Sequence, residues 1–211
     1  MQLHAASALV GHAGVPPAGA FPFTPGSFAR PAPAWSRCSI LLAPGLDEVL
    51  AQDWQRQLPR FHTVWHLDRR TPDLDVWAQA IVSAAQHPSG PVVVVAQGFA
   101  CLAAVRAAAL HPGLIAGALL TAPADPTRFG LQETLSESAP DLSSVLLVNE
   151  GDRDLPPERA WQWALHWNSQ FVSLGQGGRG AERTDRSAGQ GKPDLRLDLL
   201  EQLCRRVAGP A

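Results

Sequence analysis

The sequence has little of what nucleic-acid-binding and membrane-spanning proteins need. Its 17 Lys and Arg residues are outnumbered by 19 Asp and Glu, and the net charge is −2. A surface that binds nucleic acid needs a basic face for the phosphates, and this composition does not indicate one. No apolar run approaches the roughly 18 to 20 residues of a membrane span. We therefore expect neither nucleic acid nor a membrane as a partner.

Cysteine is scarce as well. The three cysteines, Cys38, Cys101 and Cys204, are widely spaced and form no metal-type pair. Their odd number argues against a disulfide framework. The N-terminal run Ala-Ala-Ser-Ala-Leu-Val has no basic residue before it, so a secretory signal is not indicated. We expect reduced thiols, no metal, no cofactor and a cytoplasmic location.

The 211 residues suffice for one core of ordinary size, so we expect a single folded domain over residues 38–208. Residues 1–37 are dominated by Ala, Pro and Gly, a composition without a periodic apolar face. We interpret them as a disordered extension. Phe21, Phe23 and Phe28 leave open a docking role for it, because aromatic residues in a Pro-rich tail can anchor on a groove.

After residue 38, short apolar runs alternate with helical patterns. Strands are expected over 39–43, 63–67, 91–96, 115–121, 144–149 and 170–173, and helices over 47–58, 73–86, 99–110, 157–167 and 195–207. This alternation predicts an α/β fold, a mainly parallel sheet of about six strands with helices on both faces. Ligands of such sheets bind beyond the carboxyl ends of the strands.

The central strand-to-helix turn lacks a serine. Residues 96–100 read Ala-Gln-Gly-Phe-Ala, with Gly98 at the middle position. A sharp turn of this kind, usually G-x-S-x-G, is the nucleophile elbow of α/β-hydrolases, where it presents a serine above the sheet. Glycine has no side chain with which to attack a carbonyl group.

Six segments carry a resemblance to a known family. They are ILLAPGL (40–46), DWQ (53–55), PDLDVWAQAI (72–81), VVVVAQGFACLA (92–103), GALLTAPAD (117–125) and NEGDRDLPPERA (149–160). Together these segments resemble the small bacterial serine hydrolases of the YdeN type, which include the retinoblastoma-binding-protein-nine-like hydrolases. The resemblance implies a three-layer α/β-hydrolase fold and a Ser-Asp-His triad acting on small esters or amides.

The resemblance places the family's site residues on this chain. Its nucleophile position is Gly98, and the histidine before the nucleophile is replaced by Gln97. The triad acid falls on Asp152, the triad histidine falls on Arg179, and a histidine of the first helix is replaced by Asp53. An arginine stays protonated at any working pH and cannot serve as a general base.

Backbone donors do not depend on the lost side chains. An oxyanion hole is expected from the N–H of Phe99 and from the loop at Gly45 and Leu46. We therefore interpret the chain as a hydrolase-family protein that has lost serine catalysis and keeps a pocket for a small-molecule ligand or a protein partner. The alternative is an active hydrolase of small esters or amides with a different nucleophile, for example Ser136 or Ser138.

Three further residue groups have competing interpretations. Asp152 and Arg179 form a structural ion pair in one hypothesis, whereas in the other the Gly-rich loop carrying Arg179 is simply mobile. Cys101 lies in an apolar helix, which favours an inert core residue over a replacement nucleophile. Trp163 and Trp167 stand at i and i+4, which predicts core packing on one helix face, with Trp161 pointing elsewhere.

Overall fold

The computed structural model describes residues 32–46, 58, 61–63, 72–136, 140–152, 155–175 and 194–209. Residues 1–31 of the extension expected over 1–37, and most of the helix expected over 47–58, lie outside these residues. The described residues belong to one compact unit that begins at Ala32.

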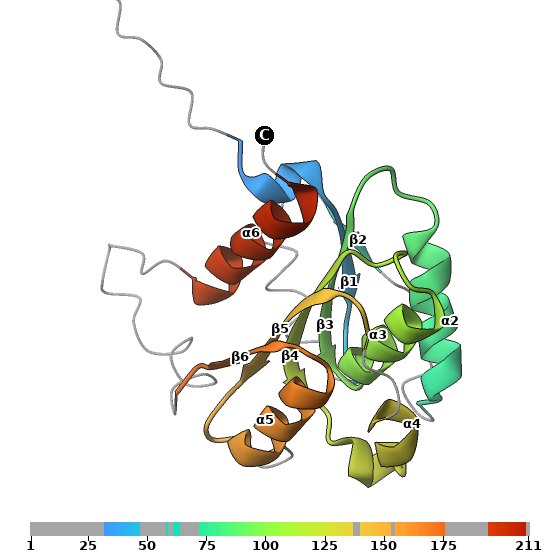
Figure 1. Cartoon of the computed structure of the whole chain (residues 1–211), viewed down its shortest axis with the longest axis vertical. Coiled ribbons are helices and arrows are strands. Elements are labelled where there is room, and N and C mark those ends of the chain that lie inside the picture. The colour runs from blue at the N-terminus through green and yellow to red at the C-terminus, as the bar shows by residue number, and fades with distance from the viewer. Residues whose placement is uncertain are drawn as a thin grey trace, which may run out of the picture. The chain divides into compact units, whose positions relative to one another are not determined.

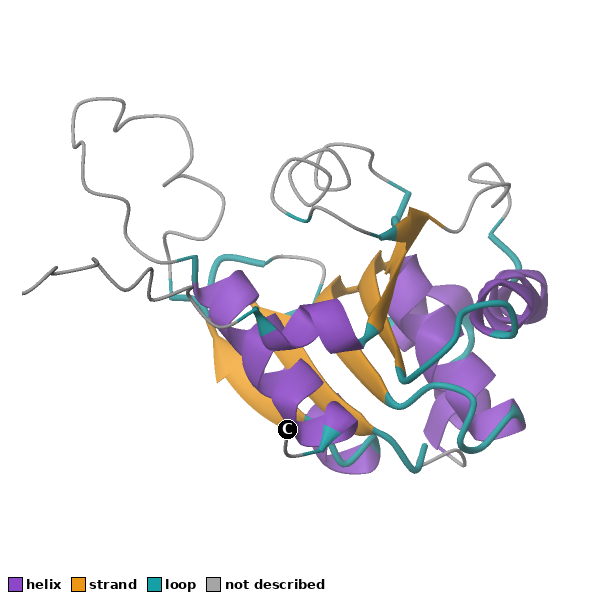
Figure 2. Cartoon of the chain, turned by 90° about the horizontal axis from the view of Figure 1, so that it is seen from above, coloured by secondary structure: helices purple, strands orange, loops and turns teal. Residues whose placement is uncertain are grey.

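The centre of the unit is a six-stranded sheet (Figures 1 and 2). Its strands are β1 (Ser39–Ala43), β2 (His62–Thr63), β3 (Val92–Gly98), β4 (Gly117–Pro123), β5 (Ser143–Val148) and β6 (Gln170–Ser173). Their order is β2-β1-β3-β4-β5-β6, and every neighbouring pair is parallel. The predicted α/β fold class is therefore confirmed.

Helices cover both faces of this sheet. They are α2 (Leu74–Ala85), α3 (Phe99–Leu110), α4 (Gln132–Ser136), α5 (Pro157–His166) and α6 (Leu195–Ala208), with short 3₁₀ turns η1 (Ala34–Arg37) and η2 (Pro126–Phe129). Buried residues of α2, α3 and α5 share one core cluster, whereas those of α6 and η1 belong to the other. The result is a three-layer arrangement.

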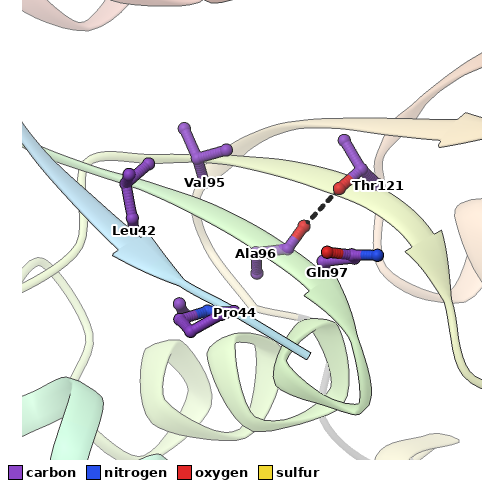
Figure 3. Close-up of a pocket in the computed structure, with 7 residues that line it drawn as sticks. Leu42, Pro44, Val95, Ala96, Gln97 and Thr121 are labelled. Carbon is purple, nitrogen blue, oxygen red and sulfur yellow. Dashed lines mark hydrogen bonds between the residues drawn. The ribbon is translucent and has the colours of Figure 1, made fainter. Parts of the chain in front are cut away.

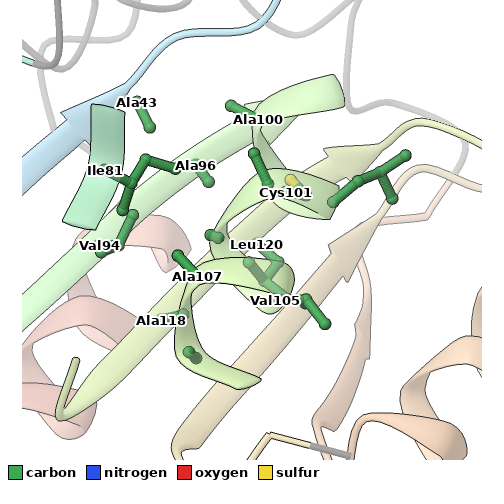
Figure 4. Packing of buried hydrophobic residues seen from close by; sticks show 14 of the residues in the cluster. Ala43, Ile81, Val94, Ala96, Ala100, Cys101, Val105, Ala107, Ala118 and Leu120 are labelled. Carbon is green, nitrogen blue, oxygen red and sulfur yellow. The ribbon is translucent and has the colours of Figure 1, made fainter. Parts of the chain in front are cut away.

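Strand β3 shows why the sheet has two apolar faces. Val92 and Val94 belong to the cluster under α2 and α3, and Val93 and Val95 belong to the cluster under α6. Successive side chains of a strand point to opposite faces, so a run of four valines serves both cores. Figure 4 shows α3 packed across β3 and β4, with Cys101 and Val105 facing the strands.

The structure differs from the sequence interpretation at its N-terminal boundary. Residues 34–37, which composition assigned to a disordered extension, form η1. Ala34 is buried, and its N–H donates to the Glu201 carboxylate of α6, with both oxygens at 2.8 Å. The contact joins residues far apart in sequence, which is why local composition did not indicate it.

Two other elements were also missed. Turn η2 and helix α4 lie in a segment for which no element was expected, because elements of four and five residues are too short to show periodicity. Of the strand expected over 63–67, Thr63 lies in β2 (His62–Thr63), and residues 64–67 lie outside the described residues. Strands β1 and β6 and helix α3 have the predicted bounds.

Candidate functional site

Gly98 forms the sharp turn between β3 and α3. Its backbone angles are φ 56° and ψ −124°, a conformation that L side chains rarely adopt. Its carbonyl accepts a hydrogen bond from the N–H of Ala124, beyond the end of β4, at 3.1 Å. The strained geometry of a nucleophile elbow is therefore present, and glycine occupies it at little conformational cost.

Gly45 lies directly beside this turn. A Cβ atom at Gly45 would come within 2.7 Å of the carbonyl oxygen of Gln97, closer than real Cβ contacts allow. Among the described residues, a Cβ at Gly98 would by contrast meet only the Cα of Gly45, at 3.8 Å. The loop after β1 thus needs glycine for its close approach, whereas the elbow has space for a side chain. Leu46, next in this loop, is exposed.

Phe99 fixes the first turn of α3. Its ring is buried and makes edge-on contacts with Trp77, at a centroid distance of 5.1 Å, and with Phe129, at 4.9 Å. The N–H of a residue at the start of a helix has no intrahelical acceptor. Because the ring is held on two sides, the backbone donor of Phe99 has a fixed position next to Gly98.

A small cavity lies below the elbow, at the carboxyl ends of β1, β3 and β4 (Figure 3). Its volume is about 10 Å³, close to the room that one water molecule needs. Its lining residues are Leu42, Ala43, Pro44, Val95, Ala96, Gln97 and Thr121. Thr121 donates its hydroxyl to the carbonyl of Ala96 at 2.7 Å, which joins β3 and β4 at this edge. The described residues thus form a tightly packed floor.

Two further irregularities follow the same edge of the sheet. Ala122, near the end of β4, has φ 43°, which is uncommon for a residue other than glycine. Asn149 follows β5, and its buried side-chain oxygen Oδ1 has no hydrogen-bond partner among the residues that the structure describes. Strained backbone and unsatisfied buried polar atoms occur preferentially at functional sites.

Asp152 lies in the loop after β5. Its N–H donates to the carbonyl of Asn149 at 3.0 Å, and its Oδ1 accepts from the N–H of Leu155 at 3.4 Å. The loop begins at the carboxyl end of β5. A triad acid is expected at this edge of the sheet. Asp53 and Arg179 lie outside the described residues, so the Asp152–Arg179 ion pair stays a prediction.

Sequence reasoning missed a buried ion pair beside this loop. Asp125 is 2% exposed. Its Oδ2 lies 2.8 Å from Nη1 of Arg159, and its Oδ1 accepts a hydrogen bond from Nη2 at 3.2 Å. Arg159 also donates to the hydroxyl of Thr127 at 2.8 Å. The Asp125-Pro126 dipeptide after a strand signals a helix cap, and Asp125 does cap η2. Nothing local in the sequence pairs it with α5.

Cys101 lies in the buried first turn of α3. Its side chain is fully buried, and its thiol donates to the carbonyl of Thr121 at 3.5 Å. Burial raises the pKa of this thiol far above its usual range. The predicted place of Cys101 in the core is confirmed, and its low reactivity stays a prediction. The side chain of Ser136, in α4, lies outside the described residues, as does the whole of Ser138.

The elbow, the parallel sheet and the two helical layers define the α/β-hydrolase class of fold. Within that class, residues 40–184 match the model of the family described as Serine hydrolase, which is more than half of the chain. The chain belongs to the Serine hydrolase family. None of the curated proteins matches it at the sequence level.

Solved structures agree with this assignment. A protein described as a YdeN-like hydrolase from Pectobacterium atrosepticum is 26% identical, with a TM-score of 0.71, over 83% of this chain and 95% of that one. An α/β-superfamily hydrolase from Xanthomonas campestris has a TM-score of 0.58 at 16% identity, over 81% and 98%. The esterase domain of a Rhodothermus marinus protein has a TM-score of 0.59 at 14% identity, over 86% and 90%. The last two show the fold alone.

Among the helices that the structure describes, none is both long and apolar enough to cross a membrane.

Proposed function

We propose that the protein binds a small carbonyl-containing ligand, such as an ester, amide or carboxylate, at the elbow and does not hydrolyse it through a covalent intermediate. The observation that carries this proposal is Gly98, which combines elbow backbone angles with no side chain. The backbone can hold a carbonyl group where the family holds its substrate, but no atom at this position can form an acyl-enzyme.

The backbone donors supply the binding chemistry. The N–H of Phe99 is positioned by the buried ring, and the Gly45 loop lies in contact with the elbow. Two N–H groups directed at one oxygen stabilise negative charge on it. A triad needs a nucleophile as well as an acid, and at the elbow the position of the nucleophile is Gly98. Gly98 thus leaves backbone donors that can bind an oxygen and no side chain that can attack a carbonyl carbon.

The irregular edge of the sheet supports a binding role over a purely structural one. The left-handed backbone of Ala122 and the buried Oδ1 of Asn149 each cost stability. Such costs are typical of functional sites, and both lie at the carboxyl edge where ligands of parallel sheets bind. A protein partner is the alternative occupant of this edge.

The test uses p-nitrophenyl acetate, a simple ester that reports both binding and hydrolysis. We expect saturation-transfer NMR to show contact between its aromatic protons and the folded protein, with nitrophenolate released no faster than in buffer. Gly45→Ala should abolish the NMR contact, because the added Cβ displaces the loop from Gln97. Gly151→Ala is the matched control, since its Cβ would meet no atom of the described part of the chain within 4 Å.

Release of nitrophenolate well above the buffer rate would contradict the proposal and favour a hydrolase with another nucleophile. Absence of NMR contact with the wild-type protein would contradict the proposal that the elbow binds a small ligand. It would favour a protein partner instead.

A further inference from the structure

Two of the three cysteines lie side by side although they are distant in the sequence. Cys38 connects η1 to β1, and Cys204 lies in α6. The Cys38 thiol donates to the backbone carbonyl of Cys204 at 3.8 Å, and the two side chains lie close enough for each thiol to shift the pKa of the other. Both are free thiols.

Contacts near the pair hold the two segments together. Ala34 donates its N–H to the Glu201 carboxylate, and Arg37 donates Nη1 to the carbonyl of Gly209 at 3.1 Å. These links join η1, which directly precedes Cys38, to residues on either side of Cys204 in the sequence. The Cys38 sulfur thus lies 3.8 Å from the backbone of the residue with which it would bond, and a disulfide requires such a close approach of the two backbones.

The accessibility of the two thiols differs. Cys204 is fully buried in the core cluster under α6, whereas Cys38 packs against the edge of that cluster and is partly exposed. A reagent from solvent can therefore reach Cys38 first. Cys204 can then react only with the adduct that Cys38 has formed with that reagent.

We propose that Cys38 and Cys204 form a reversible intramolecular disulfide when the protein meets a low-molecular-weight disulfide such as oxidised glutathione. The site is separate from the elbow and does not depend on the function proposed for it. In this pair Cys38 is the attacking thiol and Cys204 is the resolving thiol.

The chemistry proceeds in two exchange steps. The Cys38 thiolate attacks one sulfur of oxidised glutathione, which forms a mixed disulfide and releases one glutathione. The Cys204 thiolate then attacks the sulfur of Cys38 and releases the second glutathione. Two protein thiols are oxidised to one disulfide, one glutathione disulfide is reduced to two thiols, and the two thiol protons pass to the released glutathione.

The surroundings make this exchange slow at neutral pH. Burial raises the pKa of the Cys38 thiol. Burial also raises the pKa of the Cys204 thiol, far above its usual range, and the neighbouring Cys38 adds to that increase. Arg37 lowers both pKa values and Glu201 raises both. Because the thiolate is the attacking species, the rate should rise with pH from neutral to alkaline conditions.

A bond between these residues would close most of the domain into one covalent ring. All six strands lie between residues 38 and 204. A crosslink of this length restricts the unfolded chain far more than the folded one, so it stabilises the native state. The oxidised protein should therefore melt at a higher temperature than the reduced one.

The experiment exposes the folded, full-length protein to oxidised glutathione and maps its peptides without reduction by mass spectrometry. We expect one linked pair, Cys38–Cys204, with Cys101 unmodified. The melting temperature should rise by about 5 °C or more and return to its starting value with dithiothreitol. The same oxidant acting on the protein in concentrated urea shows that the reagent is active.

Two variants separate the roles of the thiols. Cys204→Ser should accumulate a stable glutathione adduct at Cys38, because no resolving thiol remains, and Cys38→Ser should form neither adduct nor link. Cys204→Ala replaces Cys204→Ser if the serine variant does not fold. The proposal is overturned if the folded wild type forms no Cys38–Cys204 link while the urea sample is oxidised. It is equally overturned if the link involves Cys101.

Discussion

Gly98 and Gly45 face each other across the elbow, with 3.8 Å between the Cα of Gly45 and the place where a Cβ of Gly98 would lie. A small side chain fits in that space without a clash. The obstacle to a serine is conformational, because φ at Gly98 is 56°.

Gly98→Ser should fold and should be less stable than the wild type. Placing a non-glycine residue in this strained conformation costs about 1–3 kcal/mol. Urea denaturation should show a fall of this size in the free energy of unfolding, with an unchanged slope. An increase in stability would show that the elbow angles are not those of the folded protein.

The double variant Gly98→Ser with Arg179→His should gain esterase activity that neither single variant has. It restores a nucleophile and a base to the positions implied by the family resemblance, which also assigns the acid to Asp152. Hydrolysis of p-nitrophenyl acetate measures the gain. Adding Asp152→Asn should remove most of it. A folded double variant without activity would contradict the assignment of these positions.

Arg159→Gln should destabilise the protein by about 2–3 kcal/mol, because it leaves the buried Asp125 carboxylate without its charged partner. We place the value below that of a fully buried pair because the Arg159 side chain is 44% exposed. Asp125→Asn should cost less, since the amide oxygen still caps η2. Urea denaturation of both single variants and the double variant gives the coupling, and additive losses would contradict a direct interaction.

The three tryptophans in and directly after α5 should differ sharply in how much each contributes to the free energy of unfolding. Trp163 and Trp167 are buried and stack at a centroid distance of 5.3 Å, as predicted from their spacing, whereas Trp161 is 52% exposed. Trp163→Ala should lower the free energy of unfolding by about 3–5 kcal/mol. Trp161→Ala, the matched control on the same helix, should change it by less than about 0.5 kcal/mol. Equal losses at the two positions would contradict the observed packing.

Features with strong local signals were predictable from the sequence. The valine run of β3 and the apolar pattern of α3 identified the centre of the sheet, and the small residues around Gly98 identified the turn between them. The predicted bounds of α3 are those of the structure.

Features that depend on distant partners were not predictable in this way. Ala34 is buried only because Glu201 and α6 lie against it, and Asp125 acquires its charge partner from α5. The contact of Gly45 with Gln97 joins two parallel strands whose register the sequence does not encode locally. Composition describes the residues of a segment, whereas these properties belong to pairs of segments.

The most direct test of the central claim is treatment of the purified, folded protein with a fluorophosphonate probe, followed by intact and peptide mass spectrometry. The probe forms an adduct with an activated serine, and the elbow of this chain carries Gly98 in that place. We predict no adduct on the wild type and a single adduct at residue 98 in the Gly98→Ser, Arg179→His variant. A stoichiometric adduct on any serine of the wild type would identify a working nucleophile and contradict the account.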